Sequence, residues 1–301
     1  MPRFEKWLTT ATADAPADSV ARAALAERLL AVRHFLDHAL GGSEEPEGIH
    51  QLRVWTRRAS AALKLFEPAI PDSQRKRMKK MLRKLRQTAG VIRDCDIHLH
   101  RLQHEDSIVP KRVIRELKRE RSQARQKLKK LRRRLQNNGR LEKLIERVLE
   151  KIGWPKRHSS RDAPPFGSFC RQQLRPLAND FFRLAEADLN DNTTLHALRI
   201  AGKRLRYGLE LAPAALPARE HRQLCESLNE IQDRLGEVCD QLMAIDQVQE
   251  CLSQSKKKSH RRRLGELLQN EQRRLKRLRS RLITWWLPHC RRLRRQWEKV
   301  L

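Results

Sequence analysis

The sequence predicts an all-α protein made of two similar antiparallel helical bundles. Leu, Ala, Arg, Lys, Glu and Gln, which have high helix propensity, dominate the 301 residues, and only 11 residues are glycine. Apolar residues recur three and four positions apart, as on one face of an amphipathic helix, whereas the alternating pattern of strands is absent. The third observation, an internal repeat, divides the helices into two sets.

Helix-ending residues mark where each predicted helix stops. They are Gly41-Gly42, Pro68, Pro71-Asp72, Pro110, Asn137-Asn138-Gly139, Pro213 and Pro217. Between them the periodicity predicts helices over 18–40, 48–67, 72–104, 110–137, 140–152, 165–187, 193–212, 218–253 and 259–299. Asp72 and Thr193 are expected to be N-caps, because a short polar side chain there can accept a hydrogen bond from a free backbone N–H.

A linker is predicted near the middle of the chain. Residues 153–164 combine glycine, prolines and polar residues and lack helical periodicity. We therefore expect one bundle over 18–152 and a second over 165–300, which together form a single domain over 18–300.

The repeat is found by shifting the chain by 146 residues. The segment HQLRVWTRR, which begins at His50, then lies on HALRIAGKR, which begins at His196. The same shift, without a gap, places Asp94 on Asp240. An ungapped register across two motifs predicts two bundles of the same construction.

The charge balance indicates a polyanionic partner. The chain has 66 Lys and Arg against 36 Asp and Glu, a formal net charge of +30, which exceeds what solubility requires. No apolar run approaches the ~20 residues of a membrane span, and the N-terminus lacks an apolar signal core, so we expect a cytoplasmic protein without membrane contact. The six cysteines contain no C-x2-C pair, which is typical of reduced core thiols.

The first repeated motif places cations on one face of a helix in each copy. At about 100° per residue, the side chains of this face lie within about 60° of the motif histidine. They are His50, Arg53, Arg57 and Lys64 in the first copy, and His196, Arg199, Lys203 and Tyr207 in the second. Neither 50–64 nor 196–207 contains an acidic residue, which a solvated surface helix would use for ion pairs. A bound anion explains such faces better than solvent does.

His50 and His196 are interpreted as anion contacts. Each has the same offset from the neighbouring cations, and a bound phosphate would raise its pKa toward the charged form. Metal ligation is disfavoured, because no second histidine or carboxylate follows at the third or fourth position on that face, and no cofactor is expected. A structural hydrogen bond and nucleophilic catalysis through histidine are the alternatives.

The second repeated motif combines a glycine and an aspartate within a helix. Gly90 and Gly236 predict the close approach of another helix. Asp94 and Asp240 are expected to orient a neighbouring arginine or to cap a bend, rather than to act in catalysis. In the first copy three arginines extend the cationic surface, namely Arg83, Arg86 and Arg93.

Two further basic runs, 111–134 and 256–295, carry cations all round the helix. They are interpreted as solvated faces that attract anions over a long range, rather than as ligand contacts. Trp285 and Trp286 are expected in the core or at an interface.

Together the motifs resemble the CHAD domain (conserved histidine α-helical domain) over about residues 18–300. The similarity rests on H-x2-R-x3-R-R from His50, on L-x2-L-x4-G-x2-R-D ending at Asp94, and on LHALRIAGKRLRYGLEL at 195–211. The resemblance implies two pseudo-symmetric bundles around a basic cavity or pore, binding of inorganic polyphosphate and association with polyphosphate granules. It also implies contacts from Arg58, Arg204 and Arg206.

Two positions depart from the family pattern. Ala59-Ser60 stands where Leu-Arg is usual, so one cation is missing, and we expect Lys64 to compensate. Cys239 stands where the first copy has Arg93. The ExExK strand motif of members fused to a triphosphatase is absent, so the chain resembles the standalone polyphosphate-binding type.

These features predict a non-enzymatic polyphosphate-binding protein. Nonspecific binding of RNA or DNA at low salt is an alternative, although aromatic residues make up only 5% of the chain and platforms for base stacking are scarce. A metal-assisted phosphohydrolase is a less favoured alternative, because the motif faces carry no carboxylate cluster to hold the metal.

Overall fold

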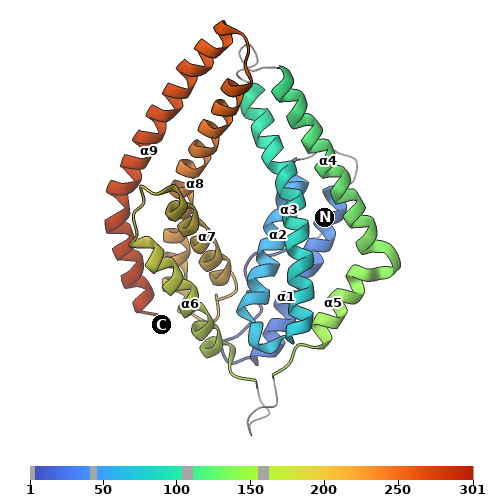
Figure 1. Ribbon diagram of the computed structural model, residues 1–301. Coiled ribbons are helices and arrows are strands. Elements are labelled where there is room, and N and C mark those ends of the chain that lie inside the picture. The colour runs from blue at the N-terminus through green and yellow to red at the C-terminus, as the bar shows by residue number, and fades with distance from the viewer. Residues whose placement is uncertain (1–3, 41–45, 104–110, 155–162, 301) are drawn as a thin grey trace. The chain divides into compact units, whose positions relative to one another are not determined.

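The computed structural model describes residues 4–40, 46–103, 111–154 and 163–300, and it is built almost wholly of helices (Figure 1). The α-helices are α1 (Ala17–His38), α2 (Pro46–Leu65), α3 (Asp72–Gln103), α4 (Lys111–Gln136), α5 (Arg140–Glu150), α6 (Phe166–Ala185), α7 (Asn192–Leu209), α8 (Ala218–Gln254) and α9 (Lys258–Glu298). Short 3-10 helices occupy Glu67–Ala69 and Asn137–Gly139. The predicted all-α class is confirmed, with bounds within a few residues of those expected.

Local sequence explains most of these boundaries. At the end of α4, Asn138 and Gly139 both adopt positive φ (56° and 62°), which breaks the helix where Asn-Asn-Gly predicts it. At the start of α7, the Asp191 carboxylate accepts hydrogen bonds from the backbone N–H groups of Thr193 (3.2 Å) and Thr194 (2.8 Å). Asp191 is therefore the N-cap, and the expectation that Thr193 caps this helix is wrong.

The chain divides into two compact units that interleave along the sequence. The first comprises Met1–Asp94, Glu120–Arg175 and Tyr207–His221, and the second Cys95–Arg119, Pro176–Arg206 and Arg222–Leu301. These units do not coincide with the predicted halves, since α3, α4, α6 and α7 each contribute to both. Most of the predicted linker, 155–162, lies outside the described residues.

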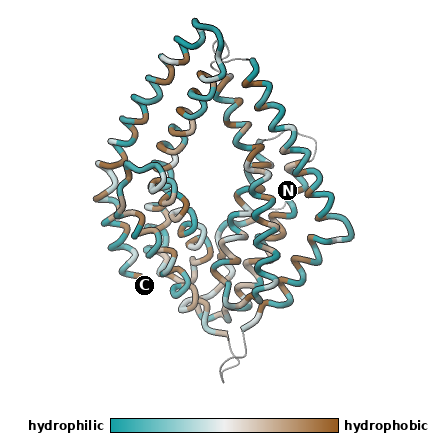
Figure 2. Tube along the Cα trace, in the orientation of Figure 1, coloured by the Kyte–Doolittle hydropathy of each residue, from teal (hydrophilic) through white to brown (hydrophobic). Residues whose placement is uncertain are grey.

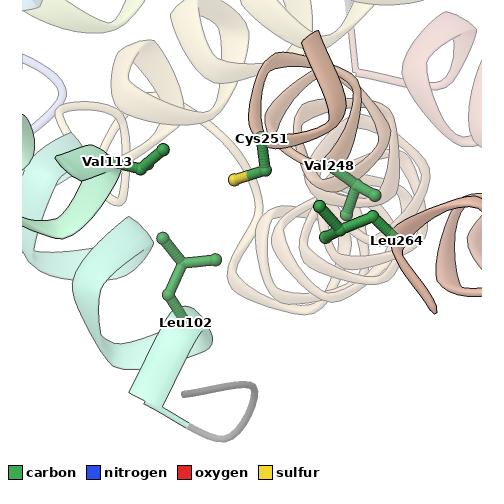
Figure 3. Packing of buried hydrophobic residues seen from close by; sticks show 5 residues of the cluster. All are labelled: Leu102, Val113, Val248, Cys251 and Leu264. Atoms are coloured by element: carbon green, nitrogen blue, oxygen red, sulfur yellow. The ribbon is translucent and has the colours of Figure 1, made fainter. Parts of the chain in front are cut away.

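An apolar cluster in the second unit explains why parts of α3 and α4 group with it. Leu102 near the end of α3 and Val113 at the start of α4 pack with Val248 and Cys251 of α8 and with Leu264 of α9 (Figure 3). All five side chains are buried. Burial of this surface stabilises the association of four helix ends that are far apart in the sequence.

The first unit has an aromatic and aliphatic core. Phe66 stacks on Phe166 and Phe169 with ring centroids 6.1 and 5.9 Å apart, and α1 packs along α2. Arg28 is buried in this core, and its guanidinium donates hydrogen bonds to the carbonyl oxygens of Ala24 and Lys6, each at 3.2 Å. Burial lowers the pKa of Arg28 to about 10.

In the second unit α8 and α9 form a long antiparallel pair (Figure 1). Apolar positions recur between polar ones along both helices (Figure 2). Trp286 is buried and donates to the Ala185 carbonyl oxygen at 2.9 Å, as the core prediction requires. Trp285 is half-buried between Arg234, whose guanidinium lies 4.3 Å from its ring centroid, and His289 at 3.9 Å.

The cysteines meet a further sequence expectation. All six cysteines are buried thiols. In the ranges that the structure describes, no helix is both long and apolar enough to cross a bilayer.

Candidate anion-binding site

In the first copy, α2 and α3 bring a histidine and several arginines together. Burial lowers the pKa of the His50 imidazole below its ordinary 6.5; Glu47 opposes this shift, and Arg93, Arg53 and Arg57 lower the pKa further. The three arginines therefore surround His50, although Arg93 comes from α3. Without a bound anion, His50 is neutral at pH 7.

The same surface holds more positive than negative charge. Burial lowers the pKa of the Arg53 guanidinium; Asp94 opposes this shift, and Arg57, Arg93 and Arg86 add to it. Three arginines thus lie near Arg53, together with one carboxylate. Because such a cluster repels itself, a bound anion would stabilise it.

Arg53 crosses the glycine of the second motif. Its side chain is only 17% exposed, and its Nη1 lies 3.4 Å from Asp94 Oδ1. A Cβ atom placed on Gly90 would lie 2.9 Å from the same Nη1, so a side chain at this position would displace the guanidinium. The close approach expected at Gly90 therefore occurs, but it is made by an arginine side chain.

The second copy repeats this arrangement. Arg199 Nη2 lies 3.9 Å from Asp240 Oδ1 and 4.0 Å from a Cβ atom placed on Gly236. Each of these residues is offset by 146 from its counterpart in the first copy. Asp94 and Asp240 thus each lie beside an arginine, which is the arrangement that the sequence interpretation expects.

The remaining side chains of the second copy lie around Cys239. Burial raises the pKa of this thiol; Arg199, Lys203 and Arg279 oppose the shift, so the three cations lie close to it. Arg279 comes from α9, and it donates to the carbonyl oxygen of Asn190 at 2.9 Å. Cys239 is the counterpart of Arg93. In the second copy cations of α7 and α9 thus lie around this position.

Several predicted contacts lie outside the clusters around His50 and Cys239. Arg58 is 12% exposed and its Nε donates to Glu210 Oε2 at 2.7 Å, while Glu210 itself is 3% exposed. Lys64 is 67% exposed and donates to Glu67 at 2.7 Å, so a neighbouring carboxylate already neutralises it. Tyr207 is buried, with 6% of its surface exposed. Of the other predicted contacts, His196, Arg204 and Arg83 are exposed and Arg206 is half-buried.

Arg86 lies next to the position where a cation is missing. Its Nη1 donates to Ser60 Oγ at 3.3 Å. The counterparts of Ser60 and Arg86 in the second copy are Arg206 and Gln232. The arginine is therefore on α3 in the first copy and on α7 in the second. Arg86 thus places a cation beside the position where the first copy lacks one. Only an alignment of both helices would have revealed this exchange from the sequence.

Carboxylates, thiols and imidazoles are dispersed in the structure. In the described ranges, no group of three or more His, Cys, Asp or Glu side chains is placed to hold a metal ion.

Comparisons with known proteins find one matching family and similar solved structures. The model of the CHAD domain family matches residues 23–249, a range that includes both copies of both motifs. The chain is similar to the crystal structure of the CHAD domain from the plant Ricinus communis, with a TM-score of 0.64, 21% identity and coverage of 99% of this chain and 96% of that chain. It is also similar to PptA from Streptomyces chartreusis, with a TM-score of 0.57, 15% identity and coverage of 90% and 99%. No curated protein matches the sequence.

Proposed function

Because the chain belongs to the CHAD domain family, we propose that it binds inorganic polyphosphate and does not turn it over. One observation carries the proposal: each copy of the repeat holds an arginine across a glycine and beside an aspartate. Within its own copy each guanidinium has the same local setting, and a ligand that carries a charge on every unit can contact either one.

The chemistry of polyphosphate matches these side chains. Polyphosphate carries a charge on every unit and has no base to be recognised, and guanidinium groups bind phosphate oxygens through two hydrogen bonds at once. Arg53 and Arg199 are only 17% and 24% exposed, so less side-chain freedom is lost on binding than at a fully exposed arginine. Affinity should fall as salt rises, because binding releases condensed counterions.

Titration calorimetry with long-chain polyphosphate at about 150 mM salt tests the assignment. The variant R199A/K203A should bind about a hundredfold more weakly, since each charge-assisted hydrogen bond contributes about 1.5–3 kcal/mol. The matched control, R133A/R134A, removes two exposed cations of α4 and should bind within about threefold of the unmodified protein. Equal losses in the two variants would contradict the site.

The absence of turnover is a separate part of the proposal. Incubation with polyphosphate and Mg²⁺ or Mn²⁺ should release no phosphate above the protein-free background. Release that disappears in His50→Gln or Asp94→Asn would instead establish a phosphohydrolase that uses these groups.

We also propose a cytoplasmic location on polyphosphate granules. A fluorescent fusion should concentrate on granules in cells that make polyphosphate. The R199A/K203A fusion should be diffuse, and granule binding by both fusions would contradict a role for the site.

A further inference from the structure

A groove of about 640 Å³ lies within the second unit, between α9 and the segment that joins α6 to α7 (Figure 1). Residues 185–190 form one wall. The other wall is a face of α9 whose residues recur three and four positions apart, namely Ile283, Trp286, Leu287, Cys290, Arg291 and Arg294. From Ile283 to Arg294 the groove follows α9 for about 16 Å, or roughly three turns. None of its residues belongs to either repeated motif.

The groove presents apolar surface to solvent. Leu287 is 55% exposed, more than any other large apolar side chain that the structure describes, and Ile283 is 39% exposed. The floor beside them consists of the buried side chains of Leu189, Trp286 and Cys290. A partner that covers this surface removes it from water, which favours binding.

Positive charge surrounds the apolar surface. Arg294 pairs with Glu186 at 2.6 Å, and Asp188 accepts hydrogen bonds from the backbone and side-chain N–H groups of Asn190, each at 2.9 Å. Both acidic residues of the lining thus have partners, whereas Arg291 has none among the residues that the structure describes. Further exposed cations of α9 lie within two positions of the lining, namely Arg281, Arg292 and Arg295.

The chemistry of the groove selects its occupant. A second copy of the chain carries the same net charge of +30 and is repelled. A phosphate chain or a nucleic-acid backbone has no apolar side with which to cover Leu287. A bilayer surface is flat, so it reaches exposed side chains but not a buried floor. An amphipathic helix lays apolar side chains into such a groove, and acidic flanks complement the arginines around it.

We propose that this groove docks an acidic amphipathic helix of a partner protein. Apolar side chains at positions i, i+3, i+4 and i+7 of the partner cover Ile283 and Leu287, and an acidic side chain pairs with Arg291. The inference does not rest on the proposed function, because the motif residues take no part in the groove.

A pair of synthetic peptides tests the proposal on the full chain. The probe is a fluorescein-labelled peptide of Leu, Ala and Glu, about 18 residues long, with its leucines on one face of a helix. The control peptide has the same composition in an order that has no apolar face, so the net charge of the protein attracts both equally. By fluorescence anisotropy at about 150 mM salt, the probe should bind at least about tenfold more tightly than the control. Equal affinities, or no binding of either peptide, would overturn the proposal.

Matched apolar variants locate the binding surface. I283S/L287S should weaken binding of the probe by about tenfold or more, because it removes both exposed apolar contacts. The control L30S/I97S removes two apolar side chains that are each 40% exposed on α1 and α3, and it should bind within about twofold of the unmodified protein. All four side chains are exposed, so both variants should remain folded. Equal losses in the two variants would overturn the proposal.

Matched charge variants test the acidic flank. Arg291→Glu should weaken binding of the probe by about tenfold, whereas Arg273→Glu, on an exposed position of α9 outside the groove, should weaken it by less than about threefold. Equal effects would show that only long-range attraction operates and would contradict the assignment. R199A/K203A should bind the probe within about threefold of the unmodified protein, so this inference and the proposed function can fail separately.

Two further measurements distinguish the occupants. A benzophenone group in place of one leucine of the probe should crosslink to residues 185–190 or 283–294, as mapped by mass spectrometry, and attachment elsewhere would overturn the proposal. Vesicles of phosphatidylglycerol and phosphatidylcholine are the rival ligand. Cosedimentation with vesicles that is lost in I283S/L287S, while binding of the probe is unchanged, would assign this surface to a membrane and contradict the proposal.

Discussion

The two copies of the repeat share their central arrangement and differ in where the surrounding cations originate. Arg53 and Arg199 are each held beside an aspartate in the same register. Arg57 of α2 and its counterpart Lys203 of α7 neighbour the two arginines in the same way, whereas the further cations come from α3 in the first copy and from α9 in the second. The comparison indicates that positive charge at the site is retained while individual positions exchange their residues.

A second difference concerns the motif residues that follow these arginines. Arg58 is largely buried in an ion pair with Glu210, whereas its counterpart Arg204 is exposed. Glu210 itself occupies the position that Lys64 has in the first copy. The same motif position thus serves stability in one copy and is accessible to ligand in the other.

Removal of the shared arginines should have the largest effect. Arg53→Ala and Arg199→Ala should each weaken binding of long-chain polyphosphate by about tenfold or more, and the double variant by about a hundredfold or more, since each loses a charge-assisted contact. Calorimetric titration measures all three. If one single variant binds like the unmodified protein, the two copies do not contribute equally and the comparison fails.

Arg58→Ala and Arg204→Ala should separate the structural position from the exposed one. Removing one partner of a buried ion pair costs about 3–5 kcal/mol of unfolding free energy, whereas an exposed substitution stays within about 0.5 kcal/mol. Urea denaturation measures the difference. The variant R58M/E210M should be more stable than Arg58→Ala, because no buried charge is left without its partner. Equal stability of Arg58→Ala and Arg204→Ala would contradict a structural role for the pair.

The exchange at Ser60 and Arg86 predicts a rescue. Arg86→Gln should weaken polyphosphate binding by about tenfold, and S60R/R86Q, which copies the second repeat, should restore it to within about threefold. Lys80→Gln, which removes one exposed charge from the same helix, is the control. Failure of the double variant to bind better than Arg86→Gln would show that the cation is not interchangeable between the helices.

The smallest expected effect is the pH dependence due to His50. Its pKa is lowered in the free protein, so it is neutral at pH 7, and a bound phosphate raises the pKa and draws a proton onto the ring. Binding should therefore weaken by about threefold between about pH 5.5 and about pH 8, and it should take up protons near pH 7. Calorimetry in buffers of different ionisation enthalpy measures this uptake. His50→Gln should abolish most of it, and unchanged uptake would contradict the assignment.

The sequence predicts the helices well because proline, glycine and asparagine interrupt otherwise continuous helical periodicity, as at Asn138-Gly139. The place of the paired aspartates beside an arginine was also predictable, because an aspartate stands at the same position of the repeat in both copies. The interleaving of the two units was not, because periodicity identifies a buried face but not the helix that covers it.

Competition between long-chain polyphosphate and RNA of equal total charge tests the central claim most directly. At about 150 mM salt, polyphosphate should displace RNA from the protein, and RNA should fail to displace polyphosphate, because the oriented arginines fit the repeating phosphates and no platform for base stacking is present on the motif faces. If each polymer displaced the other at equal concentrations, the account would be contradicted. The net charge of +30 would then attract any polyanion regardless of its shape.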